Sequence, residues 1–371
     1  MLRPRTVALL AATVTAAACG GSSSGPVAGT SAAPTPTAAT STPSSAAGQA
    51  SMMLAVGTAS GSLALYRIAL GSHAAQRVRD LPAPPGGKRL WDLTVSRGTE
   101  PDVCAVWDRT VDDASDTDNR LVCYTPDAPA GAEVTAAGHD PALAALRPDG
   151  KELAWADFKP ESNGQITVAA RGGAGATAER YLADPSQPAG DASDASFTGR
   201  DAQALAWSGN RALVISISAQ SDDGSAPVLF PRTRAAGAKG WMQARELVPP
   251  RSEFDRGYVT YDGITSATKT TALAVERRYA LADDNDPKPP DRAVRVQLPT
   301  GQVLEVLATA AAGRYLSYVG GTEDAVVYRT AAAAEGNQDG KVYVRYRTDR
   351  AGGVITGLPA DTQVIATAAS G

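Results

Sequence analysis

The chain has 371 residues and a formal net charge of −4 at pH 7. This length allows a large hydrophobic core and exceeds that of a usual single domain. The mildly acidic balance argues against nucleic acid and anionic lipid headgroups as binding partners.

Residues 1–18 predict an exported protein. Arg3 and Arg5 form a basic start, and an apolar run over 7–18 is followed directly by Cys19. This pattern is typical of a secretory signal and is too short to span a bilayer. The cysteine after small residues resembles a bacterial lipoprotein signal, which implies that Cys19 is acylated and begins the mature chain. The usual leucine three positions before the cysteine is Ala16 here, so an ordinary secretory signal with an incidental cysteine stays open.

Residues 19–50 are predicted to form a disordered tether. After Cys19 they are almost entirely Gly, Ser, Thr, Ala and Pro, with no charged or aromatic side chain. Such a segment cannot bury enough apolar surface to offset its ordering entropy. About thirty flexible residues span roughly 30 Å, so we expect the domain to be held off the membrane. Loss of Arg3 and Arg5 with the signal removes two positive charges and takes the net charge from −4 to −6.

From Ser51 onward, short alternating runs separated by turn residues predict an all-β chain built from hairpins. The clearest unit is an apolar strand over Leu143–Leu146, a Pro-Asp-Gly-Lys turn over 148–151 and a second apolar strand that begins at Leu153. Fainter copies recur about every fifty residues, a period that is typical of radial or stacked arrays.

We expect each unit to have an inner strand before the turn and a second strand after it. Second strands are predicted to begin near Leu54, Val103, Leu153, Leu213, Leu273 and Tyr315, and five of them follow inner strands at Leu90–Val95, Leu143–Leu146, Ala204–Trp207, Gly263–Ser266 and Val303–Thr309. The strand near Leu54 lacks an upstream partner, whereas Thr362–Ala368 looks like an inner strand with no strand after it. A ring in which this C-terminal strand completes the first unit accounts for both and removes exposed sheet edges.

Residues 143–170 resemble the Pro-Asp-Gly repeat in the propeller domain of the translocation protein TolB and its relatives, and Ala206–Leu213 resembles a worn copy. The resemblance implies a TolB-like, six-bladed β-propeller over residues 51–371, although a seven-bladed ring would also fit the length. The tether takes the place of the smaller N-terminal α/β domain of that family. A role in the Tol system therefore does not follow from the resemblance.

Cys104 and Cys123 are the two cysteines that remain beside Cys19. They fall on predicted strands over 103–107 and 120–124, which a hairpin joins. An antiparallel register that pairs Trp107 with Arg120 places the two cysteines opposite each other, within disulfide range. In an oxidising compartment we expect a disulfide worth about 3 kcal/mol in the chain-entropy model. Two buried free thiols are the alternative.

No catalytic residue or metal ligand is predicted. The chain has two histidines, His73 and His139, and no Cys-x-x-Cys motif, which weakens both a catalytic triad and a zinc site. The acidic runs 112–118 and 283–286 could offer oxygen ligands to Ca²⁺, but they lack the order of a calcium-binding loop and more often form solvated hairpin tips. We therefore expect no cofactor.

The place of each tryptophan in the strand pattern predicts its surroundings. Trp91, Trp155 and Trp207 lie on or beside predicted inner and second strands, so we expect them to pack in the core between blades. Trp241 lies in a polar stretch, where it fits either a strand or an exposed anchor for a partner.

Two classes of function fit these features. The first is a monomeric, non-enzymatic binding or scaffold module at the outer face of the bacterial cytoplasmic membrane. It would touch the membrane only through its lipid and would bind an envelope protein, a peptide or a cell-wall component. The second is an extracytoplasmic hydrolase that uses carboxylates or a divalent metal at the mouth of the channel. Fold does not choose between them, and we expect the binding module because no catalytic group is evident; the sequence does not identify the binding residues.

Overall fold

A computed structural model describes residues 51–109, 118–135, 139–157, 165–180, 202–210, 212–218, 225–231, 258–265, 268, 270–279, 289–298, 302–332, 340–348 and 352–370. The signal and tether predicted for residues 1–50 lie outside the described residues and stay predictions. All regular elements of the described part are strands, and none of its segments is a helix long and apolar enough to cross a bilayer.

The described strands form antiparallel sheets, five of four strands and one of three strands. We call the four-stranded sheets blades. Blade 1 contains β23 (Thr362–Ala369), β1 (Ser51–Thr58), β2 (Leu63–Ala69) and β3 (Ala75–Leu81); blade 2 contains β4 (Arg89–Val95), β5 (Val103–Asp108), β6 (Asn119–Tyr124) and β7 (Ala132–Glu133). Blade 3 contains β8 (Pro141–Leu146), β9 (Glu152–Asp157), β10 (Gln165–Ala170) and β11 (Thr177–Arg180), and the three-stranded sheet contains β12 (Ala202–Ser208), β13 (Ala212–Ser218) and β14 (Ser225–Pro231). Blade 4 contains β15 (Tyr258–Thr265), β16 (Thr271–Tyr279), β17 (Arg292–Gln297) and β18 (Val303–Thr309); blade 5 contains β19 (Arg314–Gly321), β20 (Ala325–Ala332), β21 (Lys341–Tyr346) and β22 (Gly353–Val354).

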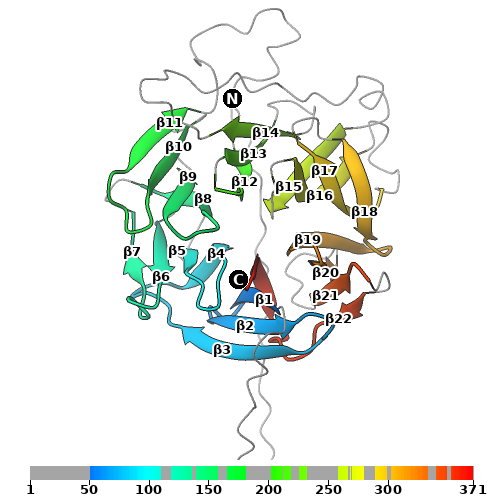
Figure 1. Cartoon of the computed structure of the whole chain (residues 1–371), viewed down its shortest axis with the longest axis horizontal. Helices are drawn as coiled ribbons and strands as arrows, with labels where there is room; N and C mark the ends of the chain where they lie inside the picture. The colour runs from blue at the N-terminus through cyan, green and yellow to red at the C-terminus, as the bar shows by residue number, and fades with distance from the viewer. Residues whose placement is uncertain are drawn as a thin grey trace, which may run out of the picture. The chain divides into compact units, whose positions relative to one another are not determined.

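The sheets are arranged in a ring with one strand of each sheet at its centre (Figure 1). These inner strands are β23, β4, β8, β12, β15 and β19, and each contacts the next around the ring. The fold is therefore a β-propeller, as expected. The expected six blades are corrected to five four-stranded blades and one three-stranded sheet. A pair of inner and second strands can be recognised in the sequence, but such a pair does not specify how many further strands its sheet contains.

The C-terminal strand closes the ring, as predicted. Strand β23 pairs with β1 from Met52 opposite Ala369 to Thr58 opposite Thr362. Beyond the strands, the Ser370 hydroxyl donates a hydrogen bond of 2.6 Å to the Ser51 carbonyl. The two ends of the described chain thus belong to one blade, and the C-terminal strand supplies the inner strand of that blade.

One predicted inner strand was wrong. Val303–Thr309 is β18, the outermost strand of blade 4, where it pairs with β17. The inner strand of blade 5 is β19, whose residue Tyr315 was expected to begin a second strand. Both strands alternate and are separated by a short glycine-containing turn, so the local sequence does not distinguish a turn within a blade from a connection between blades.

The hydrophobic core is divided among the interfaces between neighbouring sheets. Clusters of buried side chains each span two adjacent sheets, and alternate residues of one strand enter different clusters. In β1, for example, Met53 faces blade 2 and Met52 faces blade 5, and both are fully buried. Trp155 and Trp207 are buried in such clusters, as expected. This packing fixes each blade against its neighbours and holds the inner strands around the axis.

The Pro-Asp-Gly-Lys segment forms the predicted turn between β8 and β9. The backbone N–H of Gly150 donates to the Arg147 carbonyl at 2.8 Å, and the Arg147 guanidinium binds both oxygens of Asp149 at 2.7 and 2.9 Å. Although partial burial raises the pKa of Asp149, the hydrogen bonds from Arg147 and from the Lys151 N–H hold it below its ordinary value. Gly150 has a φ of +72°, in the left-handed region that favours glycine.

Gly150 also lies against blade 2, so its replacement has two separable effects. A Cβ atom at Gly150 would lie 2.6 Å from an oxygen of Asp102, whereas a Cβ at Gly209, in the equivalent turn of the three-stranded sheet, would contact nothing within 4 Å. Gly209 has a similar φ of +58°. We expect Gly209→Ala to cost about 1 kcal/mol from backbone strain alone and Gly150→Ala to cost about 2–3 kcal/mol. Denaturant midpoints measure both; equal losses would show that the contact with Asp102 does not constrain this turn.

Candidate functional site: the central channel

Every inner strand of the ring carries a β-bulge. The register of each inner strand with its second strand shifts once, and the extra residues include Trp91 in β4, Ala142 in β8, Gln203 in β12, Ser317 in β19 and Gln363 in β23. In β15 the shift falls between Asp262 and Thr265. A bulge interrupts the alternation of side chains and increases the local twist. Consecutive side chains of an inner strand can therefore both face the axis.

These strands enclose a cavity of about 620 Å³ along the axis of the ring. We call it the channel. The bulge residues Trp91, Ser317 and Gln363 line it, and so do residues that directly follow a bulge: Asp92, Leu143, Ala204, Thr265, Tyr318 and Val364. The volume falls in the range of small-molecule and peptide-side-chain pockets. The channel is thus a concave site at the centre of the ring, lined by residues of all six inner strands.

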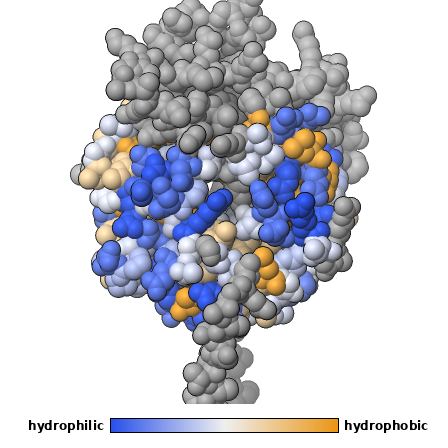
Figure 2. Space-filling model, viewed as in Figure 1, coloured by the Kyte–Doolittle hydropathy of each residue, from blue (hydrophilic) through white to orange (hydrophobic). Residues whose placement is uncertain are grey.

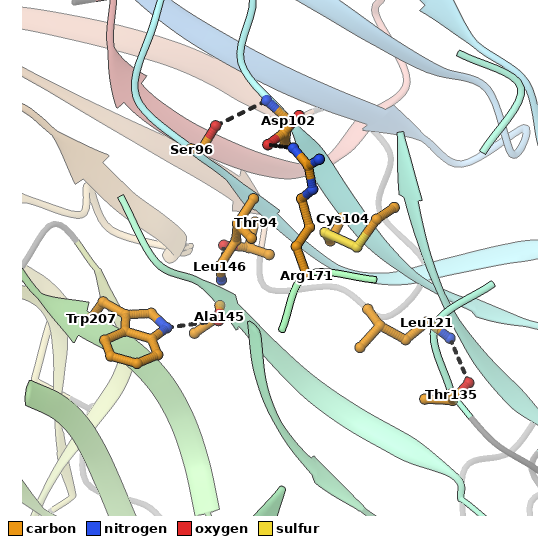
Figure 3. Close-up of a disulfide and its surroundings, with 11 residues drawn as sticks. Thr94, Ser96, Asp102, Cys104, Leu121, Thr135, Ala145, Leu146, Arg171 and Trp207 are labelled. Carbon is orange, nitrogen blue, oxygen red and sulfur yellow. Dashed lines mark hydrogen bonds and ion pairs between the residues drawn. A yellow bond between two sulfur atoms is a disulfide. The ribbon is translucent and has the colours of Figure 1, made fainter. Parts of the chain in front are cut away.

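Hydrogen bonds between neighbouring inner strands hold the channel wall in place. The Leu146 N–H donates to Thr94 Oγ1 at 2.9 Å, and Trp207 Nε1 donates to the Ala145 carbonyl at 2.8 Å, so β8 is tied to β4 and to β12 (Figure 3). On the other side of the ring, the Thr265 hydroxyl donates to the Val319 carbonyl at 2.6 Å. Such side-chain links between strands that are not paired as a sheet make the wall a preformed surface.

Asp92 is the acidic side chain at the bulge level of the channel. It projects from β4 and accepts a hydrogen bond of 2.8 Å from the Ala144 N–H of β8. Burial raises the pKa of Asp92 to about 6, against the opposing effect of that hydrogen bond. Tyr318 also lines the channel, and its hydroxyl lies 2.8 Å from Thr367 Oγ1 of β23. Burial raises the pKa of Tyr318 and the charge of Asp92 adds to this effect, so the phenol stays neutral.

The raised pKa of Asp92 predicts a specific pH dependence of stability. The folded state holds the Asp92 proton more tightly than the unfolded state does. Protonated Asp92 therefore contributes to the free energy of unfolding below pH 4, and this contribution is lost as pH rises through about 6. Asn cannot ionise but can still accept from Ala144. Asp92→Asn should therefore stabilise the protein at pH 7.5 by up to about 3 kcal/mol and change it little at pH 4. Denaturant midpoints of both proteins at both pH values test this, and an equal shift at the two pH values would contradict it.

Trp91 is exposed to the channel, which corrects the expectation that it packs in the core. Its exposed fraction is 38%, and the guanidinium of Arg89 lies 5.0 Å from the centroid of its ring. Strict alternation along β4 would have turned Trp91 into an interface between blades. The bulge at this residue breaks the alternation and leaves the indole on the channel wall.

One mouth of the channel is lined by the turns that follow the inner strands. Arg97, Thr268, Glu323 and Asp324 contribute to it, together with Arg295 of β17. The same mouth continues into a second cavity of about 710 Å³ between blades 4 and 5, which shares Thr268, Arg295, Glu323 and Asp324 with the channel. We call this second cavity the side groove. The face drawn in Figure 2 is mainly hydrophilic, with hydrophobic residues in small separate patches.

The predicted disulfide is present. Cys104 and Cys123 are bonded across β5 and β6, in the predicted register that pairs Trp107 with Arg120. Both residues are buried, against Leu146 and Trp155 of blade 3. The disulfide therefore lies inside an interface between blades (Figure 3), and neither cysteine is among the residues that line the channel. Its surroundings indicate a structural role.

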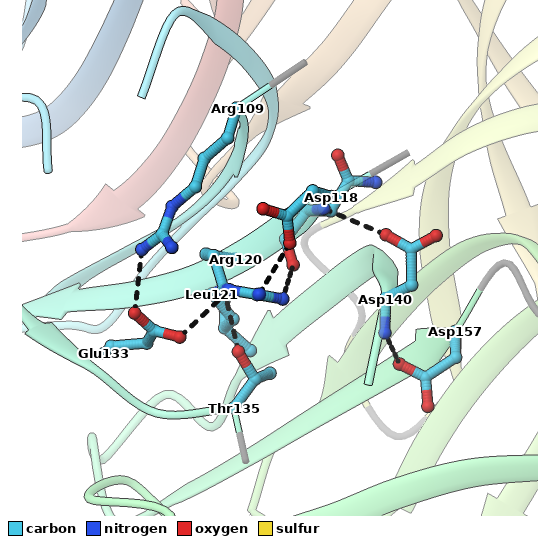
Figure 4. A network of polar contacts seen from close by, with 9 residues as sticks. Arg109, Asp118, Arg120, Leu121, Glu133, Thr135, Asp140 and Asp157 are labelled. Carbon is cyan, nitrogen blue, oxygen red and sulfur yellow. Dashed lines mark hydrogen bonds and ion pairs between the residues drawn. The ribbon is translucent and has the colours of Figure 1, made fainter. Parts of the chain in front are cut away.

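The histidines and the described part of the acidic runs take part in structural contacts. His139 Nδ1 lies 2.7 Å from Asp157 Oδ2, and His73 packs edge-on against Tyr346 at 5.8 Å. Asp118 pairs with Arg120 at 2.6 Å (Figure 4). No group of three or more His, Cys, Asp or Glu side chains among the described residues is placed to hold a metal ion. Cys19, Trp241 and the acidic residues of 112–117 and 283–286 lie outside the described residues.

A polar network joins blade 2 to blade 3 around these residues (Figure 4). The Asn119 N–H donates to Asp140 Oδ1 at 3.0 Å, and the Asp140 N–H donates to Asp157 Oδ1 at 3.1 Å. Arg120 also reaches Glu133 of β7 at 3.2 Å. These hydrogen bonds satisfy backbone donors at strand ends. His139 and Asp140 therefore have a structural role in the contact between blades 2 and 3.

Comparison with known proteins supports the fold. No protein-family model and no curated protein matches the chain. The crystal structure of TolB from Acinetobacter baumannii matches with a TM-score of 0.50 and 13% identity, over 86% of this chain and 66% of that one. A structure assigned as TolB from Agrobacterium tumefaciens matches with a TM-score of 0.47 and 9% identity, over 83% of this chain and 89% of that one. The chain thus spans slightly less than two thirds of the Acinetobacter TolB, with which it shares the fold of a β-propeller.

Proposed function

We propose that the chain is a non-enzymatic, TolB-like binding or scaffold module of the bacterial envelope, held at the outer face of the cytoplasmic membrane by a lipid on Cys19. Its propeller binds part of an envelope protein, a peptide or a cell-wall component in the channel. The alternative is an extracytoplasmic hydrolase that uses carboxylates or a metal at the channel mouth.

The observation that carries this proposal is the preformed channel. Its wall combines apolar side chains with polar side chains from several inner strands, and polar groups placed in this way can orient a bound ligand. Its mouth carries both signs of charge, Arg97 and Arg295 beside Glu323 and Asp324. A mixed rim of this kind favours recognition of a partner over a convergent set of catalytic carboxylates.

A further feature supports the proposed location. The disulfide between Cys104 and Cys123 is of a kind that forms and persists in oxidising compartments outside the cytoplasm.

Crosslinking in cells tests the proposed function. The native protein and a Cys19→Ser variant, which cannot be acylated, are compared, and the captured species are identified by mass spectrometry. We expect one dominant envelope protein, peptide or wall fragment that is captured by the native protein and lost in the variant. Capture of nothing above background, together with hydrolase activity that a chelator removes, would favour the alternative.

A further inference from the structure

We infer that the channel binds the cationic side chain of an extended peptide, a lysine ammonium or an arginine guanidinium, with the carboxylate of Asp92 as its counter-ion. This inference rests on the proposed function and specifies the chemistry of its ligand.

The first argument is the environment of Asp92. It accepts a hydrogen bond from the Ala144 N–H of the neighbouring strand β8, and no cationic side chain of the described residues forms an ion pair with it. The charge of Asp92 acts on Tyr318 of β19, which stays neutral, and β23 lines the channel with the uncharged side chains of Thr367 and Gln363. The strand β8 contributes no titratable group to the channel wall. A carboxylate that lines a cavity and lacks a counter-ion is a favourable partner for a cation supplied by a ligand.

The second argument is the aromatic residue beside it. Trp91 and Asp92 are consecutive, and the bulge places both on the channel wall. The guanidinium of Arg89 lies over one face of the Trp91 ring, 5.0 Å from its centroid, so a ligand cation would contact the other face. A ligand cation between the indole and the carboxylate would gain cation–π and ionic contacts together. Aliphatic stems of lysine or arginine suit the apolar wall that Leu143 and Val364 provide.

The third argument concerns the rest of the ligand. The channel opens at its mouth into the side groove, and Thr268, Arg295, Glu323 and Asp324 line both cavities. The side groove adds Thr270 and Thr271 together with further charged side chains. Hydroxyl, carboxylate and guanidinium groups offer the donors and acceptors that a peptide backbone requires. An extended peptide can therefore run along the groove while one side chain enters the channel.

Short peptides provide the test. Ac-Ala-Lys-Ala-NH₂ and its neutral analogue with norleucine in place of lysine are titrated against the full lipid-free chain, Cys19→Ser, with binding followed by NMR. At pH 7.5 we expect the lysine peptide to bind at least about tenfold more tightly than the norleucine peptide. At pH 5 the preference should fall severalfold, because Asp92 is then mostly protonated.

Two variants separate the inference from a structural effect. Asp92→Asn should abolish the preference for lysine at pH 7.5, although it is expected to be more stable there, so the loss cannot be attributed to unfolding. Asp80→Asn removes a carboxylate from the outer strand β3, where it pairs with Arg77, and should leave the preference unchanged. Equal binding of the two peptides, no binding of either, or a preference that survives in Asp92→Asn would each overturn the inference. The crosslinking experiment tests the proposed function without relying on Asp92. If it captures a ligand that carries no cationic side chain, the proposed function is supported and this inference is wrong.

Discussion

Deletion of residues 361–371 is expected to abolish the cooperative unfolding transition of the propeller. The deletion removes β23, which pairs with β1 along its full length and contributes Ala366 and Ala368 to the core between blades 1 and 2. It also removes the Thr362 carbonyl, which accepts from the buried Arg329 at 2.8 Å. Losing an inner strand and leaving a buried cation without this acceptor should cost more than about 5 kcal/mol, which is comparable to the whole stability of a domain.

Thermal unfolding followed by near-ultraviolet circular dichroism measures this loss. A chain that lacks only Gly371 is the matched control and should unfold like the intact protein, because Ser370 keeps its bond to Ser51. A synthetic peptide of residues 361–371 should restore part of the transition when it is added to the deleted chain. If the deleted chain keeps its original transition temperature, the ring is not closed by this strand.

Removal of the disulfide should have the second largest effect. Cys104 and Cys123 are 19 residues apart in sequence, so the bond restricts the unfolded chain by about 3 kcal/mol in the chain-entropy model. Both side chains are buried in the interface with blade 3, so the double variant Cys104→Ala/Cys123→Ala loses packing in addition. We expect its free energy of unfolding to fall by about 3–5 kcal/mol.

The reduced wild-type protein is the natural comparison for this variant, because it loses the covalent bond and keeps both sulfur atoms. Its denaturant midpoint should lie between those of the oxidised protein and the double variant. A midpoint that does not change on reduction, with free thiols confirmed by mass spectrometry, would show that the bond contributes no stability.

Much of the propeller could be predicted because its signals are local. The alternation of short strands indicated an all-β chain, and the Pro-Asp-Gly-Lys segment forms the turn that its residues favour. The register of β5 and β6 followed from their hairpin, and with it the pairing of Cys104 and Cys123. Closure by β23 followed from one unmatched strand at each end of the pattern.

The predictions were wrong where the local sequence of a strand fits two different positions in the ring. The strands β18 and β19 both alternate, and only pairing with β17 or with β20 assigns each to its blade. The count of complete blades failed for the same reason, because an inner and a second strand do not specify how many strands follow. Long-range pairing decides both questions.

The channel could not be predicted because its key feature is a departure from alternation. A bulge adds one residue to a strand without a distinctive local sequence, and it moved Trp91 from an expected core position to the channel wall. Asp92 was not singled out by the sequence, since a lone acidic residue in a strand gives no signal of its own. A repeated irregularity at the same point of each inner strand would be the pattern to search for in related chains.

The measurement that tests the central claim most directly is site-specific photo-crosslinking in cells. A photoreactive phenylalanine analogue replaces Trp91 on the channel wall or, as the matched control, Val78, which is 44% exposed on the outer strand β3. We predict one dominant product from position 91, absent from position 78 and reduced when Asp92→Asn is added. The same products from both positions, or products from position 78 alone, would contradict the assignment of the channel as the binding site.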